Sequence, residues 1–120
     1  MDSWNSIVER ALVEAYGELG VLEAIPYLED RLKLDEPADV VGGAARALAS
    51  LARRNPELQS TVVERLVPML SSTKEDVRLS VADAMQGVAL GSWRNDIERL
   101  LQREESASVR AALEKVLGAQ

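Results

Sequence analysis

The feature that most constrains the fold of this chain is an apolar pattern that recurs four times. Each copy opens on a valine, and apolar residues follow at offsets of 4, 5, 7, 8 and 11 residues, which share one face of an α-helix. The four opening residues are Val8, Val40, Val77 and Val109, spaced 32, 37 and 32 residues apart. The fourth copy departs from the pattern at Glu114 and Gln120. A period of this length is typical of repeats built from helical hairpins.

A second segment with helical apolar spacing follows each of the first three copies. The sequence therefore predicts about seven helices, arranged as three hairpins and a terminal half repeat. The predicted helices span residues 3–19, 21–34, 37–54, 56–71, 73–90, 92–104 and 106–118. They form a single domain over residues 1–120, with repeats at 3–34, 37–71, 73–104 and 106–118.

Residues that favour helix ends mark these boundaries. Ser-x-x-Glu sequences predict two capping boxes, in which each side chain satisfies a free backbone N–H: Ser6 with Glu9, and Ser72 with Glu75. Other residues with end preferences are Pro37 and Pro56 for first turns, Ser92 and Ser106 for N-caps, and Gly20 and Gly91 for left-handed C-caps. Pro26 and Pro68 lie inside the second helices and are expected to bend them.

Composition excludes several kinds of chemistry. The chain has no Cys, which rules out disulfides and thiolate sites, and no His, which removes the usual proton shuttle and metal ligand. Its net charge of −6 argues against nucleic acid and anionic membranes as partners. No segment reads as a signal peptide or a membrane span, so we expect a cytoplasmic protein.

The stretch LVPMLSSTKEDVRLSVADAMQGVA, residues 66–89, resembles the HEAT repeat. It has a second helix with a proline, a short turn, Asp-Val-Arg and an alanine-rich helix. It is also similar to the bacterial HEAT-like repeats first recognised in phycobilisome lyases. The resemblance covers essentially the whole chain, but Glu9 and Val41 stand where the pattern has arginine.

The resemblance implies an all-α fold, a right-handed α-solenoid of the ARM/HEAT type, with the second helix of each hairpin on the concave face. It also implies that Arg78 and Arg110 tie adjacent repeats together. The paired glycines Gly42-Gly43 are expected to allow close packing against the preceding hairpin, at a cost of about 1 kcal/mol each in helix propensity.

The expected function is non-enzymatic: the domain binds another protein, or another domain of a larger chain, on its concave face. No cofactor or metal is expected. The candidate contact residues are Tyr27, Arg31, Glu64, Trp93, Arg99 and Arg103. Tyr27 and Arg31 are expected to be exposed, while Trp93 either meets the partner or covers the core.

Alternatives remain open at this point. Trp93, Asp96 and Arg99 lie close together, as an aromatic residue, an acid and an arginine do in HEAT-like DNA glycosylases, so the chain could serve nucleic-acid processing. It could also assist chromophore attachment, or be a designed or excised solenoid fragment with no activity of its own. Adjacent carboxylates such as Glu104-Glu105 are interpreted as solvated charges because catalytic pairs need a cleft that separates their pKa values.

Overall fold

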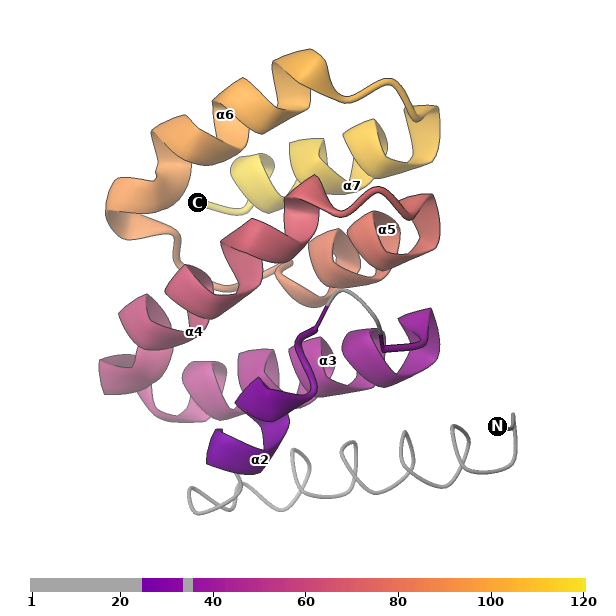
Figure 1. Ribbon diagram of the computed structural model, residues 1–120. Coiled ribbons are helices and arrows are strands. Elements are labelled where there is room, and N and C mark those ends of the chain that lie inside the picture. The colour runs from indigo at the N-terminus through magenta and orange to yellow at the C-terminus, as the bar shows by residue number, and fades with distance from the viewer. Residues whose placement is uncertain (1–24, 34–35) are drawn as a thin grey trace.

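The computed structural model describes residues 25–33 and 36–120, and this part of the chain is all-α (Figure 1). Its α-helices are α2 (Ile25–Asp30), α3 (Ala38–Arg54), α4 (Gln59–Leu66), α5 (Glu75–Ala84), α6 (Arg94–Arg103) and α7 (Ala107–Gly118). Three short 3₁₀ segments join them: η2 (Pro56–Leu58), η3 (Val67–Ser71) and η4 (Gly91–Trp93). The predicted helix 3–19, the capping box Ser6 with Glu9, and Gly20 lie outside the described residues.

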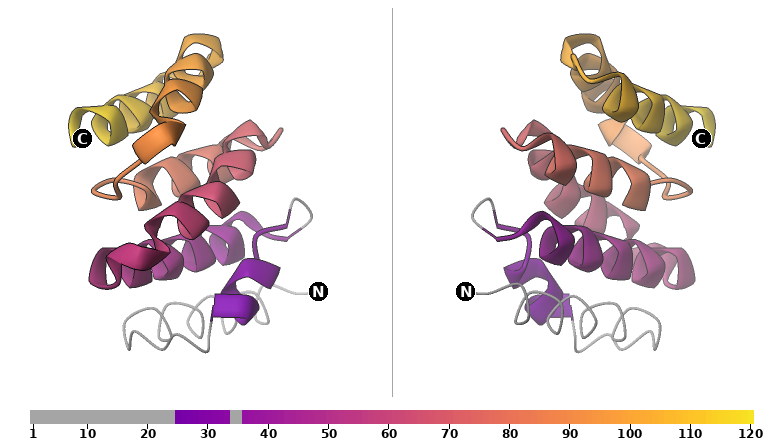
Figure 2. Two further views of the ribbon diagram at one scale, coloured as in Figure 1. Left: turned by 90° about the vertical axis from the view of Figure 1, so that its left-hand side faces the viewer. Right: turned by 90° about the vertical axis from the view of Figure 1, so that its right-hand side faces the viewer.

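The helices form two layers. In the first layer α3 packs against α5, and α5 against α7. The second layer consists of α4, η3 and α6. Helix α4 packs against α3, and helix α6 packs against α7 and η3. Figure 1 shows α3, α5 and α7 running in one direction while α4 and α6 run back in front of them, and the side views in Figure 2 show the same tiers. Helix α4 thus runs back along α3, while α6, which follows α5 in the chain, packs against α7 and η3.

One continuous apolar core joins the layers. Each described α-helix contributes a buried side chain of this core, for example Leu28, Leu48, Leu66, Val81, Ile97 and Leu113. Helix α3 is buried around most of its surface because α2, α4 and α5 all pack against it. Its many alanines and glycines suit that position, since small side chains let several neighbours approach at once.

Gly42 marks the closest approach between α3 and α5. A Cβ placed on Gly42 would lie 2.9 Å from the Cβ of Ser80 on α5, which is too close for any residue with a side chain. Close packing at Gly42 is therefore directed at α5, which follows it in the chain. Most of the preceding hairpin, against which the sequence predicts the packing of Gly42-Gly43, lies outside the described residues.

The predicted helix 73–90 is too long at both ends. Helix α5 begins at Glu75 and ends at Ala84, and the chain then turns at Gly87, whose φ of 82° is left-handed. Gly91 also has a left-handed φ, 57°, but it opens η4 and does not cap α5. Met85 and Val88 continue the apolar pattern because the turn itself packs into the core.

The predicted capping box of Ser72 and Glu75 does not form. The Ser72 hydroxyl accepts a hydrogen bond from the Lys74 amide at 3.1 Å, and α5 begins without a side-chain cap. The Glu75 carboxylate instead accepts a hydrogen bond from the Ser106 hydroxyl at the start of α7. Ser106 is the N-cap that the sequence predicts, because its oxygen also accepts from the Val109 amide. Such a cap is typically worth about 1 kcal/mol.

Two other residues predicted to mark helix starts, Pro37 and Ser92, have a different position in the structure. Pro37 is the residue before α3 rather than its first residue, and Ser92 lies inside η4 without capping a helix. Pro56 does open η2, where its missing N–H is not needed.

The second helices are shorter than predicted. The predicted helix 56–71 divides into η2, α4 and η3, and α4 ends two residues before Pro68. Pro68 has no amide N–H to donate, so the chain tightens into a 3₁₀ segment there instead of bending as an α-helix. Helix α2 ends at Asp30, short of the predicted residue 34.

Candidate functional site

The side-chain surface of the second layer is hollowed between η3 and α6. Two adjoining pockets of about 320 Å³ and 180 Å³ share Ser71, Leu100 and Arg103, and together they form what we call the η3–α6 groove. The remaining lining residues are Val67, Pro68, Leu70, Arg78, Trp93, Asp96, Arg99, Glu104 and Glu105. Segment η3 and helix α6 contact each other, and their side chains form the two sides of the groove.

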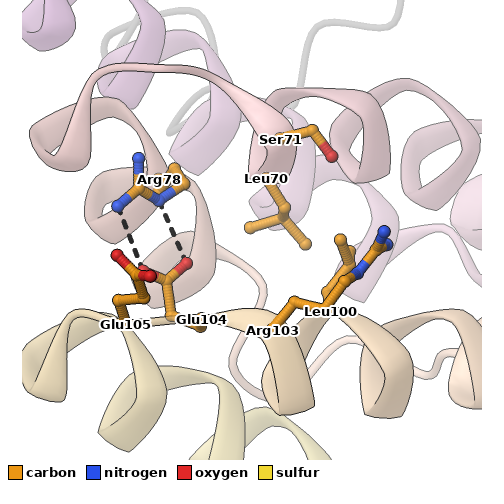
Figure 3. Close-up of a pocket in the computed structure, with 7 residues that line it drawn as sticks. All are labelled: Leu70, Ser71, Arg78, Leu100, Arg103, Glu104 and Glu105. Atoms are coloured by element: carbon orange, nitrogen blue, oxygen red, sulfur yellow. Dashed lines mark hydrogen bonds and ion pairs between the residues drawn. The ribbon is translucent and has the colours of Figure 1, made fainter.

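One wall of the groove is a bidentate ion pair between Arg78 on α5 and Glu104 (Figure 3). The Arg78 Nε and Nη2 atoms donate to the Glu104 Oε1 and Oε2 atoms, both at 3.0 Å. Arg78 Nη1 donates to the Ser72 carbonyl at 2.9 Å, and the Ser106 amide donates to Glu104 Oε2 at 3.1 Å. The pair therefore joins the turn before α5 to the turn after α6.

This wall is well shielded from solvent. The Glu104 side chain is 7% exposed and that of Arg78 is 19% exposed. Burial alone raises the pKa of Glu104, but the hydrogen bonds from Arg78 and Ser106, together with the positive charge of Arg78, outweigh burial and hold that pKa below its ordinary value. Glu104 is thus kept ionised, which is the opposite of what a general acid requires.

The hydrogen bonds of Arg78 run to Glu104, within the same predicted repeat 73–104, and to Ser72 in the turn before it, so they do not show the expected tie between adjacent repeats. The same expectation for Arg110 is wrong. Arg110 occupies the matching position on α7, but it is exposed and its side chain forms no hydrogen bond or ion pair with any residue that the structure describes. Arg78 finds its carboxylate 26 residues further along the chain, at Glu104.

Two charges in the groove stand apart from this pair. Arg103 and Glu105 are exposed, and within the described ranges neither side chain forms a hydrogen bond or an ion pair. Figure 3 shows the Arg103 side chain directed away from Arg78 and Glu104, with Leu70 between them. Arg99, by contrast, donates to Asp96 Oδ1 at 3.3 Å across one turn of α6.

Trp93, Arg99 and Arg103, all contact candidates from the sequence, come together in this groove. Trp93 is half-buried and packs against the core, as one of its two predicted roles requires, and it also lines the groove. Glu64 lines a separate hollow of about 400 Å³ that α2 and α4 border, together with Leu32 and Met69.

Tyr27 and Arg31 do not fit the expectation of an exposed pair. Both are half-buried, and the Arg31 guanidinium lies 4.3 Å from the centroid of the Tyr27 ring, a cation–π contact. Tyr27 packs against the core because α2 lies on α3. Neither residue lines the η3–α6 groove or the hollow at Glu64.

Several groove residues were not identified as site residues from the sequence. Leu70 and Leu100 have the spacing of core positions, and Ser71 and Glu105 lie in short connections without a motif. Only the contact between η3 and α6 brings them together, and no local pattern reports that contact.

The described residues offer little for metal or membrane binding. In residues 25–33 and 36–120, no three carboxylates lie close enough together to hold a metal ion. None of the helices in this part of the chain combines the length with the apolar character needed to cross a bilayer. The sequence matches no protein-family model and no curated protein.

Proposed function

We propose that this chain is a right-handed α-solenoid of HEAT-like repeats that binds another protein, or another domain of a longer chain, without catalysing a reaction. The packing of α3 on α5 and of α5 on α7 supports a solenoid, because each first helix meets the corresponding helix of the next unit. The second helices, α4 and α6, would then line the concave face.

The observation that carries the proposal is the position of the η3–α6 groove. It lies on the second-helix layer, where HEAT-like proteins are expected to bind, and it combines apolar, aromatic and charged side chains. Tryptophan and arginine are enriched among residues that dominate binding at protein interfaces. Trp93, Arg99 and Arg103 supply both types within one groove.

Site-specific photo-cross-linking tests this function. A photoreactive amino acid at position 99 or 103 is expected to capture a defined protein in the cells from which the sequence comes. The same amino acid at position 110, which is exposed on α7 outside the groove, serves as the matched control. Equal capture at all three positions, or capture at position 110 alone, would contradict binding on the second-helix layer.

Nucleic-acid binding is the second candidate, because Trp93, Asp96 and Arg99 do line the same groove. It is less well supported, since Asp96, Glu104 and Glu105 would face the phosphates and the net charge is −6. An electrophoretic shift assay at low salt with single- and double-stranded oligonucleotides separates the two functions. A shift that disappears in Arg103→Gln but persists in Arg110→Gln would favour nucleic acid.

A further inference from the structure

We propose that the η3–α6 groove receives an extended segment of a partner protein in which an acidic residue stands between an apolar residue and a basic one. This inference rests on the proposed protein-binding function and adds the chemistry of the segment. The apolar side chain would lie at the Trp93 end, the acidic one at Arg103, and the basic one at Glu105.

The order follows from how the two pockets share their walls. The smaller pocket contains Trp93, Val67 and Pro68, and the larger one contains Glu105. Arg103 lines both, so it stands where they meet. A segment that passes along the groove therefore meets an apolar and aromatic surface, then a cation, then an anion.

The charges of the groove decide which side chains of a partner would be attracted. Arg78 is engaged by Glu104, and Arg99 by Asp96, so these four residues are matched within the protein. Arg103 and Glu105 remain without a partner among the described residues. A carboxylate placed at Arg103 and an ammonium or guanidinium placed at Glu105 would complete both pairs.

The groove also suits an extended main chain. Leu70 and Leu100 provide apolar surface, and the exposed Ser71 lies in both pockets with a hydroxyl that can donate or accept a hydrogen bond. Ser71 forms no side-chain hydrogen bond with any part of the chain that the structure describes. A peptide amide or carbonyl crossing the middle of the groove could therefore bond to it.

Fluorescence anisotropy with short synthetic peptides tests the order of side chains. The probe carries Leu, Asp and Lys, separated by glycine and serine, with Asp in the middle. One matched peptide replaces Asp by Asn, and another keeps the same composition with Leu in the middle. We expect the probe to bind about three- to fivefold more tightly than either matched peptide, the factor that one partly exposed ion pair contributes.

Protein variants locate the binding. Arg103→Gln is expected to weaken the probe by about the same three- to fivefold factor, whereas Arg110→Gln, an equal change of charge outside the groove, leaves its affinity unchanged. A charge exchange provides an independent readout: Arg103→Glu should prefer a peptide with Lys in place of Asp. Circular dichroism of each variant checks that it remains folded, and the peptide replacements need no variant at all.

Each outcome bears on the proposal. Binding that depends on the central Asp and on Arg103, but not on Arg110, supports it. No binding of the probe up to about 1 mM, equal affinity for all peptides, or equal loss in Arg110→Gln overturns it. The proposal is also overturned if a single-stranded oligonucleotide binds more tightly than the probe peptide and its binding depends on Arg103. If the peptides fail while photo-cross-linking from positions 99 and 103 still captures a protein, the segment chemistry is wrong and the protein-binding function stands.

Discussion

Replacing Arg78 by methionine should destabilise the protein by about 2–3 kcal/mol. The change keeps most of the apolar stem but removes the two hydrogen bonds to Glu104 and the one to the Ser72 carbonyl. Glu104 would be left as a carboxylate that is 7% exposed and bonded only to the Ser106 amide. Breaking a fully buried pair costs about 3–5 kcal/mol, and we expect less here because the groove lets water reach the stranded carboxylate.

Urea denaturation followed by far-ultraviolet circular dichroism measures this loss. In thermal unfolding of a domain of this size, a loss of about 2–3 kcal/mol in the free energy of unfolding corresponds to a fall in Tm of roughly 8–12 °C. A double-mutant cycle with Arg78→Met, Glu104→Gln and the double variant should give a coupling free energy of about 1–2 kcal/mol. Arg110→Met is the matched control, since Arg110 is exposed and its loss should cost less than about 0.5 kcal/mol.

The reasoning is refuted if Arg78→Met and Arg110→Met lower the free energy of unfolding by the same amount. It is also refuted if the coupling free energy is near zero while Arg78→Met is strongly destabilising. That second result would mean that Arg78 acts through its packing or through Ser72, and not through its pair with Glu104.

Three further predictions concern other parts of the structure. Gly42→Ala should lower the free energy of unfolding by about 1–2 kcal/mol, because the new Cβ would meet Ser80 and this outweighs the better helix propensity of alanine. Gly118 has open space around it, so Gly118→Ala should be neutral or stabilising in the same urea titration. Gln120→Ala should lower the free energy of unfolding by about 0.5–1.5 kcal/mol, because Gln120 accepts a hydrogen bond from the Leu90 amide and donates one to the Val88 carbonyl. It should also speed hydrogen exchange of the Leu90 amide, and unchanged exchange would contradict this prediction. The folded pKa of Glu104 lies below its ordinary value, so its contribution to stability is present above pH 4.5 and is lost as the pH falls through the folded pKa. In a plot of the free energy of unfolding against pH, Glu104→Gln should therefore flatten the acid side. The control Glu114→Gln, on the surface of α7, should leave that side unchanged.

Helices with strong signals at both ends were predictable from the sequence. Helices α3 and α7 begin and end within about a residue of the predicted limits, because Pro37 and Ser106 mark their starts. Helix α5 was predicted too long because apolar spacing reports burial and not helical geometry. Met85 and Val88 are buried, but they lie in the turn that follows the helix. The left-handed Gly87 belongs to the same turn, so the helix has ended before Gly91.

The groove was predictable only where its residues share one helix. Arg99 and Arg103 lie one turn apart on α6, so a single helical face brings them together, and Trp93 directly precedes α6 as the last residue of η4. The partner of Arg78 was not predictable, because Glu104 lies 26 residues away and meets it only through packing of α5 with the turn after α6. The burial of Tyr27 was not predictable for a similar reason, since it comes from the contact of α2 with α3.

The contacts of Arg53, Arg78 and Gln120 share a property that matters for how this sequence can change. Each side chain donates to a main-chain carbonyl, at Gln86, Ser72 and Val88 respectively; the first and last lie more than 30 residues away, and Ser72 lies in the turn before α5. A carbonyl is present whichever amino acid occupies the position, so these turns can be held while their own side chains vary. Pairwise covariation between residues would therefore miss these contacts. An engineer could rewrite the exposed positions of the turns without losing them, provided that the three donors and the left-handed Gly87 are kept.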